Sequence, residues 1–179
     1  MSPTHKKLRE GTATAHARVD AAFAGFDLTD RADYARFLMA HAELVWPLEA
    51  ALPGDRIVED WEARKRGDLL HEDLAFLRPA PHPAEAPAER WVLDSDAQVA
   101  GTLYVLEGSR LGGRFIARSL PSGFPRAYLD AHQGADKWQQ LLQRIDAILQ
   151  EPAALNSALA SAHAAFAAFE RSAARWAKG

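Results

Sequence analysis

The sequence contains no cysteine. Disulfide bonds, zinc–thiolate sites, iron–sulfur clusters and thiol nucleophiles are therefore excluded, as is any cofactor attached through a thioether. A membrane-spanning run is also missing, because no stretch of about 18 uncharged residues is apolar enough to cross a bilayer. The N-terminal segment MSPTHKKLRE lacks the apolar core of a secretory signal. We therefore expect a cytoplasmic protein that does not bind a membrane.

A large excess of basic charge is missing too. The chain has 21 Lys and Arg residues against 24 Asp and Glu residues, a formal net charge of −3. It therefore provides no positive field for nucleic acid, and we expect none to bind. Three basic residues adjoin at Arg64, Lys65 and Arg66, but acidic residues flank them on both sides. This mixture predicts a solvated helix face rather than an anion site.

Helical periodicity dominates what is present. Apolar residues recur at a spacing of 3.6 over long segments, and alternating strand patterns are not convincing. We expect six helical segments. The first lies near 4–23, the second runs from a cap at Thr29 or Asp30 to the turn at Pro53, and the third lies near 58–77. The fourth runs from a cap at Asp94 or Ser95 to about 120, and the last two lie near 128–149 and 152–176. Pro47 should kink or break the second helix, and the proline-rich stretch 78–89 should be a loop. The pattern predicts an all-α, single-domain helical bundle over residues 1–179.

Three glycines interrupt the fourth helical pattern, at Gly108, Gly112 and Gly113. Each should cost about 1 kcal/mol relative to alanine in a helix interior. Three explanations remain open. The glycines could permit tight helix packing, mark a break between two shorter helices, or let a flat ligand lie against the backbone where a Cβ would clash.

His16 is the second unusual feature. Helical spacing places Thr12, His16 and Asp20 on one side of the first helix, one turn apart. A histidine that ligates a metal through one nitrogen usually donates its other N–H to an acceptor, which Asp20 can provide. The alternative is an ordinary surface or half-buried histidine with a hydrogen bond to the next turn, and His16 by itself leaves both interpretations open.

Other candidate sites are weaker. The neighbours 71–73 (His-Glu-Asp), like His41 and Glu43, point in different directions on a helix. Ser109 follows a glycine, but the GxSxG pattern and a preceding strand are both missing, which also argues against a dinucleotide-binding turn. His163 is expected to be a partly exposed helix residue rather than a ligand.

Taken together, the two unusual features resemble one known family. The first helix has the form LRxxTxxxHxxxD over residues 8–20, and the glycine segment reads YVLEGSxLGG over residues 104–113. This combination resembles the heme oxygenases, with a closer likeness to the bacterial type that includes the bacteriophytochrome-associated enzymes. The resemblance covers nearly the whole chain, including Pro47-Leu48-Glu49 and the phenylalanines at 166 and 169.

The resemblance implies a heme oxygenase-like helical domain with heme held between the first helix and a glycine-kinked distal helix. His16 would ligate the iron, and Arg9, Thr12 and Phe166 would also contact the heme. The catalytic distal wall would consist of Gly108, Ser109, Gly112 and Gly113. Heme would be both substrate and cofactor. Its cleavage to biliverdin, CO and ferrous iron would use O2 and an electron donor such as a ferredoxin or a reductase. A bacteriophytochrome would be a possible biliverdin acceptor.

Two departures from the family pattern affect this prediction. Many members have an aspartate where this chain has Ser109, which puts the route of proton delivery in doubt. The basic residues that bind the heme propionates in mammalian-type members are replaced by glutamines at 139, 140 and 143. Arg9 is the best substitute, followed by Lys137 and Arg114, and a rotated heme would change which meso carbon is attacked.

Two other functions remain open. One is a non-catalytic heme-binding or heme-carrier protein of the same fold, although a carrier would more naturally close both axial positions and no distal histidine is evident in the sequence. The other is a helical protein of the wider fold that binds no heme, such as an enzyme acting on another small molecule.

Overall fold

The computed structural model describes residues 2–78, 89–131 and 134–177. Within these ranges the chain forms seven α-helices and one 3-10 helix, and no strand. The elements in chain order are α1 (Pro3–Phe23), α2 (Arg31–Ala51), η1 (Gly54–Arg56), α3 (Trp61–Arg64), α4 (Gly67–Leu77), α5 (Asp96–Ser119), α6 (Ala135–Ile148) and α7 (Pro152–Trp176). The predicted all-α class is confirmed.

Local sequence signals determine where several helices begin. The Asp30 side chain caps α2 by accepting from the backbone N–H of Asp33 at 2.8 Å. Ser95 and Gln98 form a reciprocal capping box at the start of α5. Pro152 occupies the first position of α7, where its missing N–H carries no cost. Of the alternative caps considered, the structure selects Asp30 and Ser95.

Two expected elements differ from the structure. The predicted helix 58–77 is divided into α3 and α4, and the predicted start of the next-to-last helix at 128 is too early, since α6 begins at Ala135. Of the kink or break expected at Pro47, the break is excluded, because α2 continues through Pro47 to Ala51. Most of the expected proline-rich loop, residues 79–88, lies outside the described residues.

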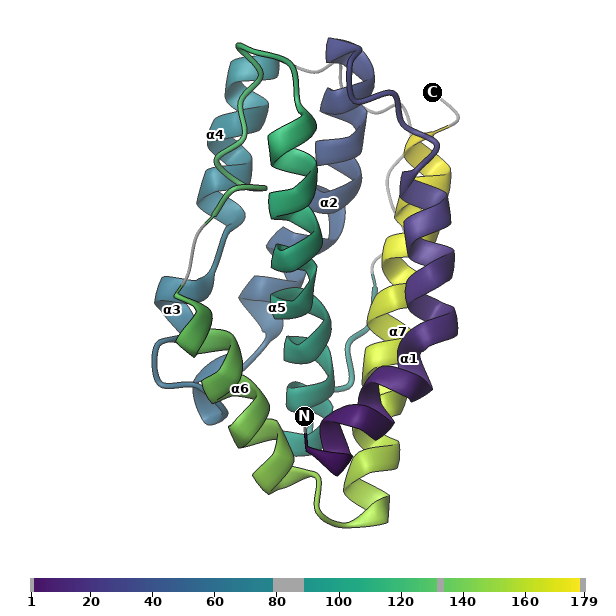
Figure 1. Ribbon diagram of the computed structural model, residues 1–179, viewed down its shortest axis with the longest axis vertical. Coiled ribbons are helices and arrows are strands. Elements are labelled where there is room, and N and C mark those ends of the chain that lie inside the picture. Colours follow the sequence, from purple (N-terminus) through teal and green to yellow (C-terminus); the bar gives the residue numbers. More distant parts are fainter. Residues whose placement is uncertain (1, 79–88, 132–133, 178–179) are drawn as a thin grey trace.

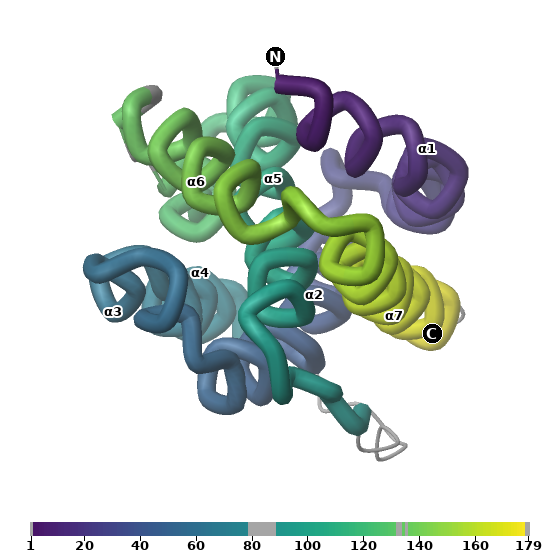
Figure 2. The backbone as a smooth tube through the Cα atoms, turned by 90° about the horizontal axis from the view of Figure 1, so that it is seen from below, coloured from purple at the N-terminus to yellow at the C-terminus, as the bar shows by residue number. Residues whose placement is uncertain are grey.

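The helices pack around α5 (Figure 1). α5 contacts α7 along one side and α6 along another, while α1 lies along α7 and α2 packs between α7 and α4. The view along the bundle shows the α1–α7 pair on one side and α3 with α4 on the other (Figure 2). No helix among the described residues is both long and apolar enough to span a membrane.

Small residues bring α5 and α7 close together. Ala158, Ala162 and Ala165 of α7 are fully buried, and a Cβ at Gly101 of α5 would overlap the backbone of Ala158. Gly101 therefore serves close helix packing. The largest fully buried side chains are Tyr34, Tyr128, Phe37, Leu8, Leu38, Leu44, Leu48, Leu70, Leu103, Leu141, Ile145 and Leu149.

Candidate functional site

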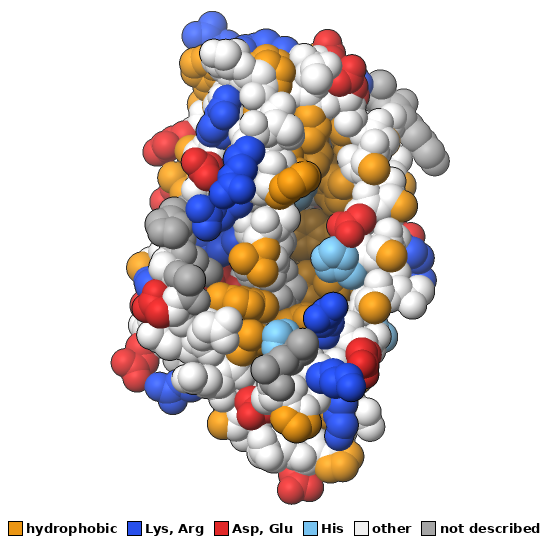
Figure 3. Space-filling model, viewed as in Figure 1, with side chains coloured by type: hydrophobic (Ala, Val, Ile, Leu, Met, Phe, Trp, Pro, Cys, Tyr) orange, Lys and Arg blue, Asp and Glu red, His pale blue; other side chains and the backbone are white. Residues whose placement is uncertain are grey.

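A cleft of about 680 Å³ separates α1 from α5. Its size falls within the range of about 300–1,000 Å³ typical of small-molecule sites. Figure 3 shows a hollow lined mainly by apolar side chains and flanked by charged ones. Its lining residues include His5, Arg9, Thr12, His16, Asp20 and Phe23 of α1; Phe37 and His41 of α2; Arg66, just before α4; Tyr104, Gly108, Ser109, Leu111, Gly112 and Gly113 of α5; and Tyr128, Leu129, Trp138, Phe166 and Phe169.

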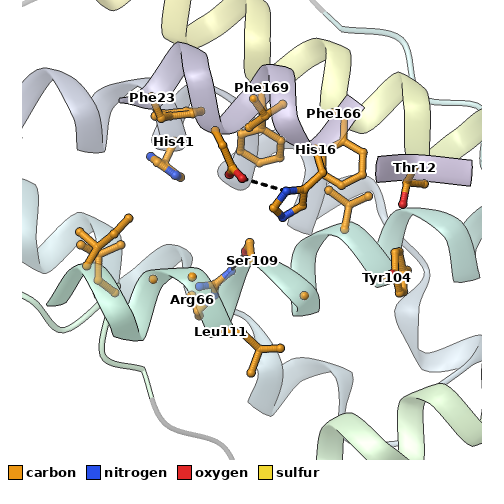
Figure 4. Close-up of a pocket in the computed structure, with 18 of the residues that line it drawn as sticks. Thr12, His16, Phe23, His41, Arg66, Tyr104, Ser109, Leu111, Phe166 and Phe169 are labelled. Carbon is orange, nitrogen blue, oxygen red and sulfur yellow. Dashed lines mark hydrogen bonds and ion pairs between the residues drawn. The ribbon is translucent and has the colours of Figure 1, made fainter. Parts of the chain in front are cut away.

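His16 stands on the α1 wall of this cleft. Its Nδ1 lies 2.9 Å from Oδ2 of Asp20, and its ring meets the Phe166 ring edge-on at 5.7 Å between centroids. Figure 4 shows the imidazole directed from α1 toward α5, with its other nitrogen facing the cleft. The His16 side chain is 62% exposed and forms part of the cleft lining. Asp20, the predicted partner of His16, thus contacts the ring at Nδ1, and Phe166 contacts it edge-on.

Polar residues gather at the end of the cleft where α1 begins. Arg9 is exposed there, and Thr12 is buried with its hydroxyl donating to the Leu8 carbonyl at 2.9 Å. Burial raises the pKa of the nearby Tyr104 phenol, an effect reduced by a hydrogen bond with Thr12 and by the charge of Arg9. His5 is also part of this end, edge-on to the Tyr104 ring at 6.1 Å.

The two weaker basic candidates lie elsewhere. The Lys137 ammonium pairs with Asp60 at 2.6 Å, outside the cleft lining. Arg114 is half-buried and is likewise not among the lining residues. Of the three basic residues considered, only Arg9 faces the cleft.

The three glycines of α5 have different surroundings. A Cβ at Gly112 would meet nothing within 4 Å, and one at Gly108 would lie 3.6 Å from the Trp138 ring. A Cβ at Gly113 would lie 3.1 Å from the Leu129 carbonyl, so that glycine also serves packing. α5 runs uninterrupted through all three, which excludes a break between two helices. The open space beside Gly112 favours the explanation in which a ligand approaches the backbone.

Ser109 faces the cleft beside a buried cation. Arg66 donates from Nη2 to the Ser109 hydroxyl at 2.9 Å and to the Leu106 carbonyl at 3.1 Å. The Ser109 hydroxyl donates to the same carbonyl at 2.6 Å. The Arg66 guanidinium also lies over the Tyr128 ring, 4.7 Å from its centroid. Figure 4 shows Arg66 and Ser109 opposite His16.

The prediction of a solvated basic face at residues 64–66 is therefore wrong. Arg64 is 3% exposed and Arg66 is 4% exposed. Arg64 pairs with Glu107 of α5 at 3.1 Å, a contact between residues far apart in sequence. The acidic residues nearby in sequence gave no indication of this arrangement, so sequence reasoning missed Arg66 as a cleft residue.

As a candidate site, His41 was paired in the sequence with Glu43 and judged weak. The structure places its ring in the cleft wall, 4.5 Å from the Phe23 ring and 4.6 Å from the Phe37 ring, centroid to centroid. Burial lowers the pKa of His41 to about 4, and its Nδ1 bonds to the Phe37 carbonyl at 2.9 Å. His41 is therefore a neutral imidazole at neutral pH, with Nδ1–H as the donor.

Clusters of three or more metal-ligating side chains are not found among the described residues. His163 is exposed on α7, as expected, and its Nε2 lies 2.8 Å from the Gly11 carbonyl. The cleft thus offers one histidine, His16, that is oriented by a carboxylate.

Comparison with known proteins gives two findings, although no family model matches the sequence. The chain is 36% identical over 155 residues to a protein named heme oxygenase from Xanthomonas campestris pv. campestris (strain 8004). That alignment covers 78% of this chain and 88% of the relative. The fold is similar to the crystal structures of NO- and CO-bound heme oxygenase from Neisseria meningitidis, with a TM-score of 0.74 and 19% identity over 98% of this chain and 92% of that one.

Proposed function

The chain belongs to the heme oxygenase family, and we propose that it binds heme in the cleft between α1 and α5 and cleaves it to biliverdin, CO and ferrous iron. One observation carries the proposal. An imidazole whose Nδ1 is fixed by Asp20 faces, across the cleft, a stretch of α5 where Gly112 leaves open space. A flat ligand with a metal at its centre needs both features.

The residues on α1 fit heme as a substrate that also acts as its own cofactor. His16 would ligate the iron through Nε2, since Nδ1–H is held by the Asp20 carboxylate and the partner of a ligating histidine raises its basicity. Phe166, edge-on to the His16 ring, would help to keep that ring in place. When bound, the iron would supply the redox chemistry with O2.

The two ends of the cleft differ in polarity and would orient the substrate. Arg9, Thr12 and Tyr104 supply a cation and hydroxyl groups at one end, whereas Phe23 and Phe37 line the other. Heme has two carboxylates on one edge, and a guanidinium is the strongest partner for a carboxylate. We therefore assign the propionate end to Arg9, and the apolar edge to the phenylalanines.

The α5 wall would control the proton supply. Gly108, Gly112 and Gly113 line this wall without side chains, and Ser109 presents a hydroxyl group there. A guanidinium offers N–H donors and no acceptor and does not serve as a proton source, so Arg66 would orient water. The protons would therefore come from solvent, through water held by Ser109 and Arg66.

The reaction also requires partners. Heme cleavage consumes O2 and electrons, and we propose a ferredoxin or a reductase as the electron donor. A bacteriophytochrome that accepts the biliverdin is a further proposal. Both rest on the family and on the chemistry of the reaction.

Absorption spectra test the proposal. Purified protein titrated with hemin is expected to give a Soret band that is lost or shifted in His16→Ala. The matched control is His163→Ala, which removes an exposed histidine of α7 outside the cleft lining and should leave the band unchanged. Ascorbate, or a ferredoxin with its reductase, should then bleach the Soret band and produce biliverdin absorbance. A stable spectrum would indicate a heme carrier, and no Soret band in the wild type would reject heme binding.

A further inference from the structure

Glu49 lies near the end of α2, and its carboxylate is buried at the start of α4. Its two oxygens accept the backbone N–H groups of Arg66 at 2.8 Å and of Gly67 at 2.9 Å. The first N–H groups of a helix have no partner within the helix, and no side chain of α4 itself caps this end. Glu49 thus supplies, from another helix, the acceptors that α4 lacks.

A second contact fixes the same turn. The Trp46 indole N–H donates to the Gly67 carbonyl at 3.0 Å. A Cβ at Gly67 would lie 3.0 Å from Glu49 Oε2 and 3.0 Å from the Trp46 ring, so the two side chains close around a residue without one. α2 therefore holds both the N–H and the C=O of Gly67.

The side chain of Arg66 extends from this fixed backbone to α5. Its guanidinium contacts the Leu106 carbonyl, the Ser109 hydroxyl and the face of Tyr128. Among the described residues no carboxylate forms an ion pair with this guanidinium. By contrast, Arg64 and Arg110 both pair with Glu107, at 3.1 and 2.9 Å. Arg66 therefore has no direct carboxylate partner among the described residues, and its guanidinium lies in the cleft wall beside Ser109.

We propose that Glu49 is a positioning residue, which holds the backbone of Arg66 so that its guanidinium meets Ser109 at the α5 wall of the cleft. Glu49 contacts neither the cleft nor the guanidinium, and would act only through the first turn of α4. Burial raises the pKa of Glu49, whereas the two N–H bonds and the charges of Arg66 and Arg110 oppose that effect. The inference rests on the proposed function, because the position of Arg66 affects what binds to the heme in this cleft.

Fluoride affinity of the ferric heme complex measures the placement of Arg66. Fluoride is a small anion that binds ferric heme and accepts hydrogen bonds, so a cation and a hydroxyl beside it should strengthen binding. We expect Arg66→Met to weaken fluoride binding about tenfold. Glu49→Gln keeps the shape of the side chain but leaves a single carbonyl oxygen for two N–H groups, and should weaken binding about threefold.

The double variant separates positioning from a general structural effect. In an Arg66→Met background, Glu49→Gln should cause no further loss of fluoride affinity, because the group that it positions is already gone. Equal losses in both backgrounds, or no loss in either, would overturn the proposal. Glu62→Gln is the control. It also removes one negative charge, from an exposed glutamate that pairs with Lys65, and should leave fluoride affinity unchanged.

Two further measurements keep the test independent of folding and of heme. If Glu49→Gln does not fold, Gly67→Ala disturbs the same contact by displacing Glu49 and Trp46, and should also weaken fluoride binding. In heme-free protein, the Arg66 guanidinium resonance in ¹H–¹⁵N spectra, assigned with Arg66→Met, should change from an ordered signal to a broadened one in Glu49→Gln. An unchanged Arg66 resonance in Glu49→Gln would refute the role of Glu49. If the wild type gives no Soret band with hemin, heme binding is refuted but the positioning role of Glu49 is not.

Discussion

Nδ1 of His16 lies 2.9 Å from Oδ2 of Asp20, one helical turn further along α1. Both side chains are more than half exposed, at 62% and 67%. Exposed pairs of this kind contribute little to the free energy of unfolding, about 0–1 kcal/mol. The same contact nevertheless selects which imidazole nitrogen faces the cleft, so its main effect is on ligation rather than on stability.

Removing Asp20 should therefore separate the two effects. In Asp20→Ala we expect hemin affinity to fall about 10- to 100-fold, because the imidazole loses its orientation and part of its basicity. The unfolding free energy of the heme-free protein should change by less than about 0.5 kcal/mol. Hemin titration and urea unfolding measure the two quantities. Glu10→Ala, which removes an exposed partner of Lys6 on the same helix, is the control and should change neither. An unchanged hemin affinity in Asp20→Ala would contradict the role given to Asp20.

Two glycines of α5 should respond in opposite ways to alanine. At Gly112 a Cβ meets nothing within 4 Å, so Gly112→Ala should stabilise the heme-free protein by up to about 1 kcal/mol through helix propensity. The same methyl group would enter the cleft and should weaken hemin binding. At Gly101 a Cβ would overlap the Ala158 backbone, and Gly101→Ala should lower the thermal midpoint sharply. Thermal unfolding and hemin titration of both variants check this, and a destabilised Gly112→Ala would refute the open space.

The charge of Arg9 should determine how heme is oriented. Arg9→Gln removes a cation that faces the cleft, and we expect weaker hemin binding together with a changed ratio of biliverdin isomers, measured by chromatography of the product. Arg18→Gln is the matched control, since Arg18 lies on the same helix but pairs with Glu170 and is not in the cleft lining. Identical isomer ratios in the wild type and in Arg9→Gln would assign the propionates to other residues.

Protonation of His41 should destabilise the fold in acid. Its pKa is about 4 in the folded protein, below the ordinary value of 6.5. Between these two pH values the unfolded chain binds a proton that the folded chain does not, so the unfolding free energy decreases as the pH falls from 6.5 to 4. His41 contributes at most about 1.4 kcal/mol per pH unit to the slope of unfolding free energy against pH. This slope falls to zero above about pH 7, where neither the folded nor the unfolded chain protonates His41.

Urea unfolding of heme-free protein across this range gives the slope. His41→Gln cannot take up the proton and should make the dependence on pH less steep by about one proton. A variant with the same slope as the wild type would show that His41 is not protonated on unfolding in this range.

Local signals in the sequence predicted much of the fold. The Ser95 cap, the Pro152 start and the periodicity of the apolar residues depend on neighbours within a few positions, so they can be read from the chain alone. The same holds for His16 and Asp20, which adjoin through helical spacing. The expected helix 58–77 was wrong because contacts from α2 and α5, remote in sequence, hold Arg64 and Arg66 and divide the segment.

The sequence by itself determined the helical class, the positions of the imidazole and of its carboxylate partner, and the three glycines that α5 contributes to the cleft wall. Only the tertiary structure decided that Arg66 lies beside Ser109, that His41 is a neutral member of the cleft wall, and that Gly101 rather than Gly112 is required for packing. The physical reason is distance along the chain. Helix periodicity relates residues three and four apart, whereas burial and ion pairing depend on which helices meet, and one helical face does not specify its partner.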